Sequence, residues 1–120
     1  MPKLAPKLLI AVLIAMVGTL AVAGVVYAKT YRLSASKSNL AFNVKTIRAS
    51  KGSVTLSMAN PSSLPHGIAI KGHGKNVKGK TVNKGGTSRV TVTLKPGVYT
   101  IFCGLPGHRQ LGMATTLTVT

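Results

Sequence analysis

From residue 29 to the C-terminus, short runs of alternating apolar and polar residues dominate the chain. In the run GSVTLSMAN, Val54, Leu56 and Met58 share one face, and hydroxyl side chains occupy the other. A period of two residues is typical of a β-strand that buries one face. No stretch after residue 28 has a convincing helical period. The pattern therefore predicts an all-β fold for this part of the chain.

Turn-forming clusters separate the alternating runs. Gly, Pro, Asn and Ser dominate the clusters NPSSLP, KGHGKNVKGK, NKGG and KPG. Several short strands at this spacing favour a β-sandwich or a β-barrel. The polar, glycine-rich segment 71–86 is predicted to be one long, mobile connection. The other alternating runs are TYRLSASKSNLAFNVKTIRAS, HGIAI, SRVTVTL, VYTIFC and ATTLTVT.

A hydrophobic segment precedes these strands. Residues 8–28, LLIAVLIAMVGTLAVAGVVYA, carry no charge and follow a short region with Lys3 and Lys7. A positive region, an apolar core and small residues before position 29 are typical of a cleaved secretory signal. The same segment is long enough to span a bilayer as a retained N-terminal hydrophobic helix. We therefore predict a signal peptide or membrane anchor in residues 1–28, and one domain exported from the cytoplasm in residues 29–120.

The charge balance excludes several kinds of chemistry. The chain has 16 Lys and Arg residues and no Asp or Glu. A carboxylate pair for glycoside cleavage, a Ser-His-Asp triad and an oxygen-rich calcium site are therefore all impossible. High positive charge is typical of proteins that bind nucleic acid or anionic membranes. Here the basic residues are evenly spread and few aromatic side chains could stack on bases, which favours a solvated basic surface and no nucleic-acid partner.

The single cysteine, Cys103, excludes a disulfide within the chain. It ends the run VYTIFC on the same face as Ile101, so it could simply be a small buried apolar residue. Its neighbours favour another interpretation, because His108 and Met113 follow at two equal steps of five residues. A thiolate, an imidazole and a thioether together suit copper better than hard cations. Glycines and a proline between them allow the intervening loop to turn back on itself.

A trigonal copper site with two histidines, one cysteine and a weak axial methionine needs a second histidine. His66 and His73 are the candidates. His66 follows Pro65 and directly precedes an apolar alternating run, so a strand end could hold it in place. His73 lies between two glycines in a basic loop, and we interpret it as an exposed residue without a role at the site.

At these residues the chain resembles the cupredoxins, the small blue-copper proteins, and among them the plastocyanin-like and azurin-like bacterial members. The motifs NPSSLPHGIAI and GVYTIFCGLPGHRQLGMATTLTVT carry the resemblance. It implies a Greek-key β-sandwich and one copper ion, with His66, Cys103 and His108 as strong ligands and Met113 as the long axial ligand. It also implies an apolar patch around the exposed edge of His108. Plausible members of that patch are Leu64, Leu105, Pro106 and Leu111.

The resemblance further implies a function. We expect an electron carrier, not an enzyme, that cycles between Cu(I) and Cu(II) and passes electrons between redox partners outside the cytoplasm. Its basic surface favours an acidic redox partner, with possible membrane association through residues 8–28, and we expect a monomer. Two alternatives stay open: a copper-delivery protein without redox turnover, and a basic structural or nucleic-acid-binding β module.

One departure from the family pattern concerns the link between the two ligand regions. Many cupredoxins have Asn after the first histidine, and its side chain bonds a Ser or Thr that follows the cysteine. This chain has Gly67 and Gly104 at those positions. We therefore expect a less constrained ligand loop.

Overall fold

The computed structural model describes residues 27–120, so the predicted N-terminal helix, signal or anchor lies outside the described residues. Within this part no helix is long and apolar enough to cross a membrane. The described chain is all-β, as predicted, and forms eight strands. These are β1 (Lys29–Ser34), β2 (Thr46–Ala49), β3 (Gly52–Ala59), β4 (Ile68–Gly72), β5 (Lys75–Lys78), β6 (Thr87–Leu94), β7 (Gly97–Cys103) and β8 (Ala114–Val119).

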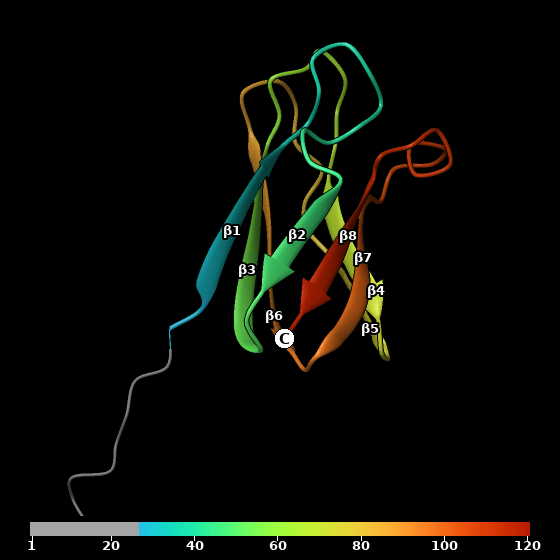
Figure 1. The fold of residues 1–120 in the computed structure, drawn as a ribbon. Coiled ribbons are helices and arrows are strands. Elements are labelled where there is room, and N and C mark those ends of the chain that lie inside the picture. The colour runs from blue at the N-terminus through green and yellow to red at the C-terminus, as the bar shows by residue number, and fades with distance from the viewer. Residues whose placement is uncertain (1–26) are drawn as a thin grey trace, which may run out of the picture.

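The strands form two sheets packed face to face, which confirms the predicted sandwich (Figure 1). One sheet has the order β1-β3-β6, and the other has the order β2-β8-β7-β4-β5. β1 and β2 each run parallel to their neighbours, β3 and β8, whereas the other pairs are antiparallel. The run at residues 30–50 therefore forms two strands that belong to different sheets, and residues 35–45 cross between them.

The core lies between the inner faces of the two sheets. Val54, Leu56 and Met58 are completely buried, so the predicted inner face of β3 is confirmed. β6 alternates without exception between buried and exposed residues along its whole length. From the second sheet, Ile101 and Leu117 contribute fully buried side chains to the same core. Burial of this apolar surface supplies most of the stabilisation in a chain whose side chains cannot form ion pairs with one another.

The prediction of one long connection over residues 71–86 is wrong. Its first half forms the end of β4 and all of β5, joined by a two-residue turn at His73 and Gly74. Both turn residues have positive φ, 48° and 80°, which is the conformation of the tight turns that suit twisted hairpins. Glycine adopts this conformation readily and histidine tolerates it. The glycine-rich sequence therefore encodes a hairpin turn here rather than a flexible loop.

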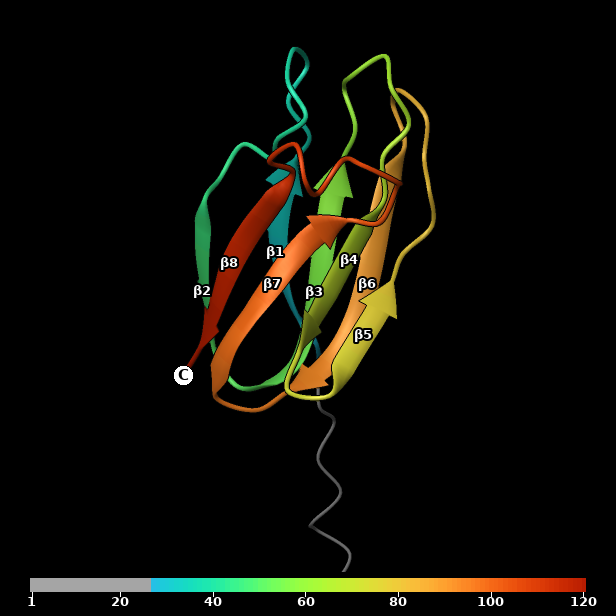
Figure 2. The same ribbon diagram turned by 90° about the vertical axis from the view of Figure 1, so that its right-hand side faces the viewer.

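Four connections meet at one end of the sandwich, which we call the loop end (Figures 1 and 2). They are residues 35–45, 60–67, 79–86 and 104–113. Backbone hydrogen bonds join three of them: Val82 exchanges two with His66, and the Gly104 amide donates to the Gly67 carbonyl. The loop end is where the chain gathers its candidate metal ligands.

Candidate metal centre

Two neighbouring strands position the first two candidate ligands. Cys103 is the last residue of β7 and pairs with Ile68, the first residue of β4. His66 lies two residues before that strand. An isolated bridge to Val82 holds its backbone, with N···O distances of 3.1 and 2.8 Å. The strand ends thus place a thiol and an imidazole side by side from segments 37 residues apart in the sequence.

Residues 104–113 curl back over the end of β7. The Cys103 amide donates to the Met113 carbonyl at 3.1 Å, which closes the loop at its base. The Met113 amide in turn donates to the His108 carbonyl at 3.1 Å. Gly107 has a φ of 80°, a left-handed conformation that favours glycine and turns the chain just before His108. The loop therefore returns His108 to the sulfur of Cys103.

Three candidate ligand atoms converge at this point. The Nδ1 atoms of His66 and His108 lie 3.3 Å apart, and the Cys103 Sγ lies 3.5 Å from His108 Nδ1 and 3.9 Å from His66 Nδ1. Trigonal metal–nitrogen bonds of about 2.0 Å and a metal–sulfur bond of about 2.3 Å would separate the nitrogens by about 3.5 Å, and nitrogen from sulfur by about 3.7 Å. The three side chains therefore fit one metal ion.

The chemistry of these donors narrows the choice of metal. One thiolate and two imidazoles are soft to intermediate ligands, and the described part of the chain offers no carboxylate side chain to a harder cation. Met113 is completely buried at the base of the same loop. His73 lies at the opposite end of β4, where its ring packs 4.9 Å from that of Tyr99.

Comparisons with known proteins identify the family. The family model of copper-binding proteins of the plastocyanin/azurin family matches residues 29–120. The chain belongs to this copper-binding family. Cupredoxins are its blue-copper members, so the predicted cupredoxin-type sandwich and the copper cofactor are both confirmed.

Several solved structures have the same fold as this chain. Auracyanin B matches with a TM-score of 0.71 and 23% identity, over 82% of this chain and 93% of that one. Dithionite-reduced auracyanin from Roseiflexus castenholzii matches with a TM-score of 0.69 and 23% identity, over 78% of this chain and 99% of that one. Auracyanin A from Chloroflexus aurantiacus, a "blue" copper protein, matches with a TM-score of 0.67 and 23% identity, over 78% of this chain and 100% of that one. A search of curated proteins found no match.

Burial favours the neutral form of His66 in this cupredoxin. His66 and Cys103 are each 1% exposed, whereas His108 is partly exposed. Burial, and secondarily the charge of His108, lowers the pKa of His66 below its usual value. A metal ligand must be unprotonated, so this shift keeps the His66 lone pair available at neutral pH.

A buried asparagine, which the sequence did not single out, holds the loop that carries His66. The Asn60 amide nitrogen donates to the carbonyls of Leu64 (2.8 Å) and Val82 (3.0 Å). Its oxygen accepts from the Ser62 amide and hydroxyl at 3.0 and 2.9 Å. Asn60 is 1% exposed, and its side chain therefore uses its full hydrogen-bonding capacity to join residues 60–67 to residues 79–86. The only signal in the sequence was its place at the end of a strand, before a proline.

Gly67 and Gly104 cannot form the side-chain link of the family, but other contacts hold the ligand loop that we expected to be less constrained. The Gly104 amide donates to the Gly67 carbonyl at 3.4 Å. The Arg109 guanidinium lies over the Phe102 ring, 4.9 Å from its centre. Phe102 is on the outer face of β7, yet only 7% of it is exposed. The ligand loop therefore packs against the strand that carries Cys103.

Proposed function

We propose that the protein is a type 1 copper electron carrier, with His66, Cys103 and His108 as strong ligands and Met113 as the weak axial ligand. The trigonal spacing of one sulfur and two nitrogens supports this proposal most directly. Bound at these residues, copper would supply a one-electron redox couple. Two histidines, one cysteine and a distant methionine are the donor set of blue-copper electron-transfer sites.

The fold would hold the copper ligands rigidly and leave one of them accessible to a redox partner. The end of β7, the Val82 bridge and Asn60 fix the ligand backbones, so little rearrangement accompanies a change in charge. Burial of His66 and Cys103 shields their donor atoms, Nδ1 and Sγ, from bulk water, while partly exposed His108 offers a short path to the surface. Leu64 and Leu111, exposed to 50% and 70%, are apolar residues of the ligand-bearing segments that a partner could cover. The donor set calls for no substrate, base or nucleophile, which favours a carrier over an enzyme.

Location and partners are part of the proposal. The hydrophobic residues 8–28 support export from the cytoplasm, with residues 29–120 acting as a monomer between redox partners. All but two of the 16 basic residues lie in residues 29–120, which favours an acidic partner surface. Electron-transfer rates with such a partner fall as ionic strength rises, because salt screens the attraction. Rates independent of salt would contradict this docking mode.

Addition of Cu(II) to the purified protein tests the function. We expect an intense blue colour from charge transfer between sulfur and copper, and reversible voltammetry. Cys103→Ser should abolish the colour, and His66→Ala should alter the spectrum. His73→Ala, a histidine at the other end of β4, is the matched control and should leave the spectrum unchanged. A colourless protein would favour the basic structural module, and a blue protein with irreversible voltammetry would favour copper delivery.

A further inference from the structure

The second ring nitrogen of His66 lacks a partner. Nδ1 faces Cys103 and His108, and no hydrogen bond within residues 27–120 involves Nε2. No fully buried side-chain nitrogen or oxygen in that part of the chain is left unpaired. Solvent must therefore reach Nε2, although the whole His66 side chain is only 1% exposed.

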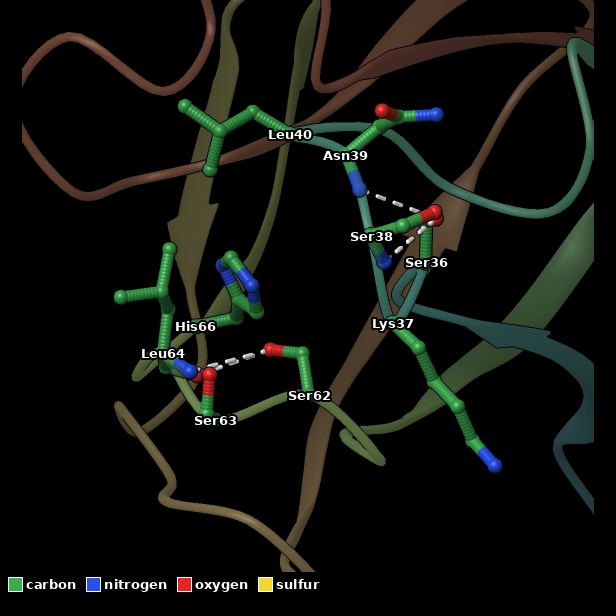
Figure 3. A pocket seen from close by; sticks show the side chains of 9 residues that line it. All are labelled: Ser36, Lys37, Ser38, Asn39, Leu40, Ser62, Ser63, Leu64 and His66. Carbon is green, nitrogen blue, oxygen red and sulfur yellow. Dashed lines mark hydrogen bonds between the residues drawn. The ribbon is translucent and has the colours of Figure 1, made fainter.

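A cavity of about 270 Å³ lies against His66 (Figure 3). Residues 36–40 form one wall and residues 62–64 form the other. The lining combines the leucines Leu40 and Leu64 with four serines, Ser36, Ser38, Ser62 and Ser63. The Ser62 hydroxyl is already hydrogen-bonded to Asn60 and Leu64. Lys37 stands at the rim, and its side chain extends away from the ring, so its charge acts through its field.

A ligand histidine almost always donates its second N–H to a carboxylate, a carbonyl or water. With Nδ1 directed at the metal centre, Nε2 carries the proton and requires an acceptor. The described protein supplies none, so the acceptor comes from solution through the cavity. The chain has no acidic side chain, and its positive field favours an anion over neutral water.

We propose that this cavity binds a small inorganic anion of the size of chloride, which accepts the His66 Nε2–H bond. The proposal rests on the proposed copper function of the same site. An anion here would make the imidazole a stronger donor and would favour the oxidised, more positively charged state of the centre. Anion binding would therefore lower the reduction potential, and the surrounding anion concentration would tune it.

A chloride titration at constant ionic strength, with the bulky anion isethionate as replacement, tests the proposal. In the reduced copper protein we expect a saturable shift of the His66 Nε2–H NMR signal. The midpoint potential should fall with chloride, by about 59 mV if chloride binds the oxidised state ten times more tightly. Absence of a saturable NMR shift, or a potential that follows ionic strength alone, would overturn the proposal.

Single substitutions can distinguish chloride binding at this cavity from a general effect of the chain's positive charge. Ser63→Leu should narrow the cavity beside His66 and weaken the chloride response. Lys37→Gln should weaken chloride binding severalfold, whereas Lys51→Gln, which removes the same charge at the opposite end of the sandwich, should leave it unchanged. Equal weakening by both lysine variants would contradict a specific site. A blue protein without a chloride response would overturn only this inference, whereas a protein that binds no copper would overturn the proposed function as well.

Discussion

The guanidinium of Arg109 lies over the ring of Phe102, 4.9 Å from its centre. Phe102 precedes Cys103 in β7, so successive side chains at this strand end point to opposite faces of the sheet. The cysteine faces inward to the candidate metal centre, and the phenylalanine faces outward beneath residues 104–113. One strand end therefore carries a candidate ligand on one face and, on the other, a contact that holds the loop of residues 104–113.

Arg109→Gln should loosen the ligand loop. Loss of the cation–π contact should lower the free energy of unfolding by about 0.5–1 kcal/mol. Amide hydrogen exchange in residues 104–112 should become faster, because the loop keeps only its backbone hydrogen bonds. Arg48→Gln removes the same charge from an exposed position on β2 and serves as the control. Equal effects of the two variants would show that charge, rather than stacking on Phe102, is responsible.

Asn60→Ala should lower the free energy of unfolding by about 2 kcal/mol or more, because it leaves buried backbone groups of residues 60–67 and 79–86 without partners. Chemical denaturation measures this loss. Release of the loop should also broaden or shift the copper spectrum through His66. Asn76→Ala, at an exposed position of β5, is the matched control and should change stability by less than about 0.5 kcal/mol. An unchanged spectrum in Asn60→Ala would argue against a role in positioning His66.

The metal-free protein should lose stability as the pH falls below about 6.5. His66 has a lowered pKa in the folded state and the usual value of 6.5 when unfolded. Below the unfolded value, the unfolded chain binds a proton that the folded chain does not, so the free energy of unfolding decreases until the folded pKa is passed. Denaturation between about pH 8 and pH 5 measures the slope. The slope should diminish in His66→Ala, and an equal slope in that variant would exclude His66 as its source.

Gly67 and Gly104, which stand where many cupredoxins have a side-chain link, should differ in how well they tolerate an added side chain. A Cβ at Gly67 would lie 3.2 Å from the Lys80 carbonyl oxygen, whereas one at Gly104 meets only the flexible Lys78 side chain at 3.7 Å. Gly67→Ala should therefore destabilise the protein by about 1 kcal/mol or more, and Gly104→Ala by less than about 0.5 kcal/mol. Thermal or chemical unfolding of the pair measures the difference. The reverse order would show that the Lys80 backbone moves aside easily.

Local sequence patterns predicted much of the fold. The alternation in β3 and β6 follows directly from one buried face per strand, and it identified Val54, Leu56 and Met58 as core residues. The hairpin of β4 and β5 could not be predicted in this way, because KGHGK is equally compatible with a loop. Its identity as a turn depends on the pairing of Gly72 with Lys75 and on positive φ at His73, which tertiary structure decides.

The candidate site, like the fold, could be predicted from the sequence only in part. Fixed spacing in the sequence pointed to Cys103, His108 and Met113, and a strand boundary pointed to His66. The supporting residues gave no such signal, because Asn60 acts on Val82, which lies 22 residues away in the sequence. The contact of Arg109 with Phe102 also depends on how the loop folds back. Residues that bond across loops become visible only when the loops are placed in space.

The first and last strands of the described chain, β1 and β8, begin and end respectively at the same end of the sandwich, away from the candidate ligands (Figures 1 and 2). Lys29 pairs with Val54 near the start of β3, and Thr120 accepts a hydrogen bond from the Lys51 amide just before that strand. A fluorescent fusion, an affinity tag or a linker to an electrode can therefore be attached at Lys29 or Thr120 without covering the loop end. A molecule immobilised in this way would present His108 to the solution rather than to its support.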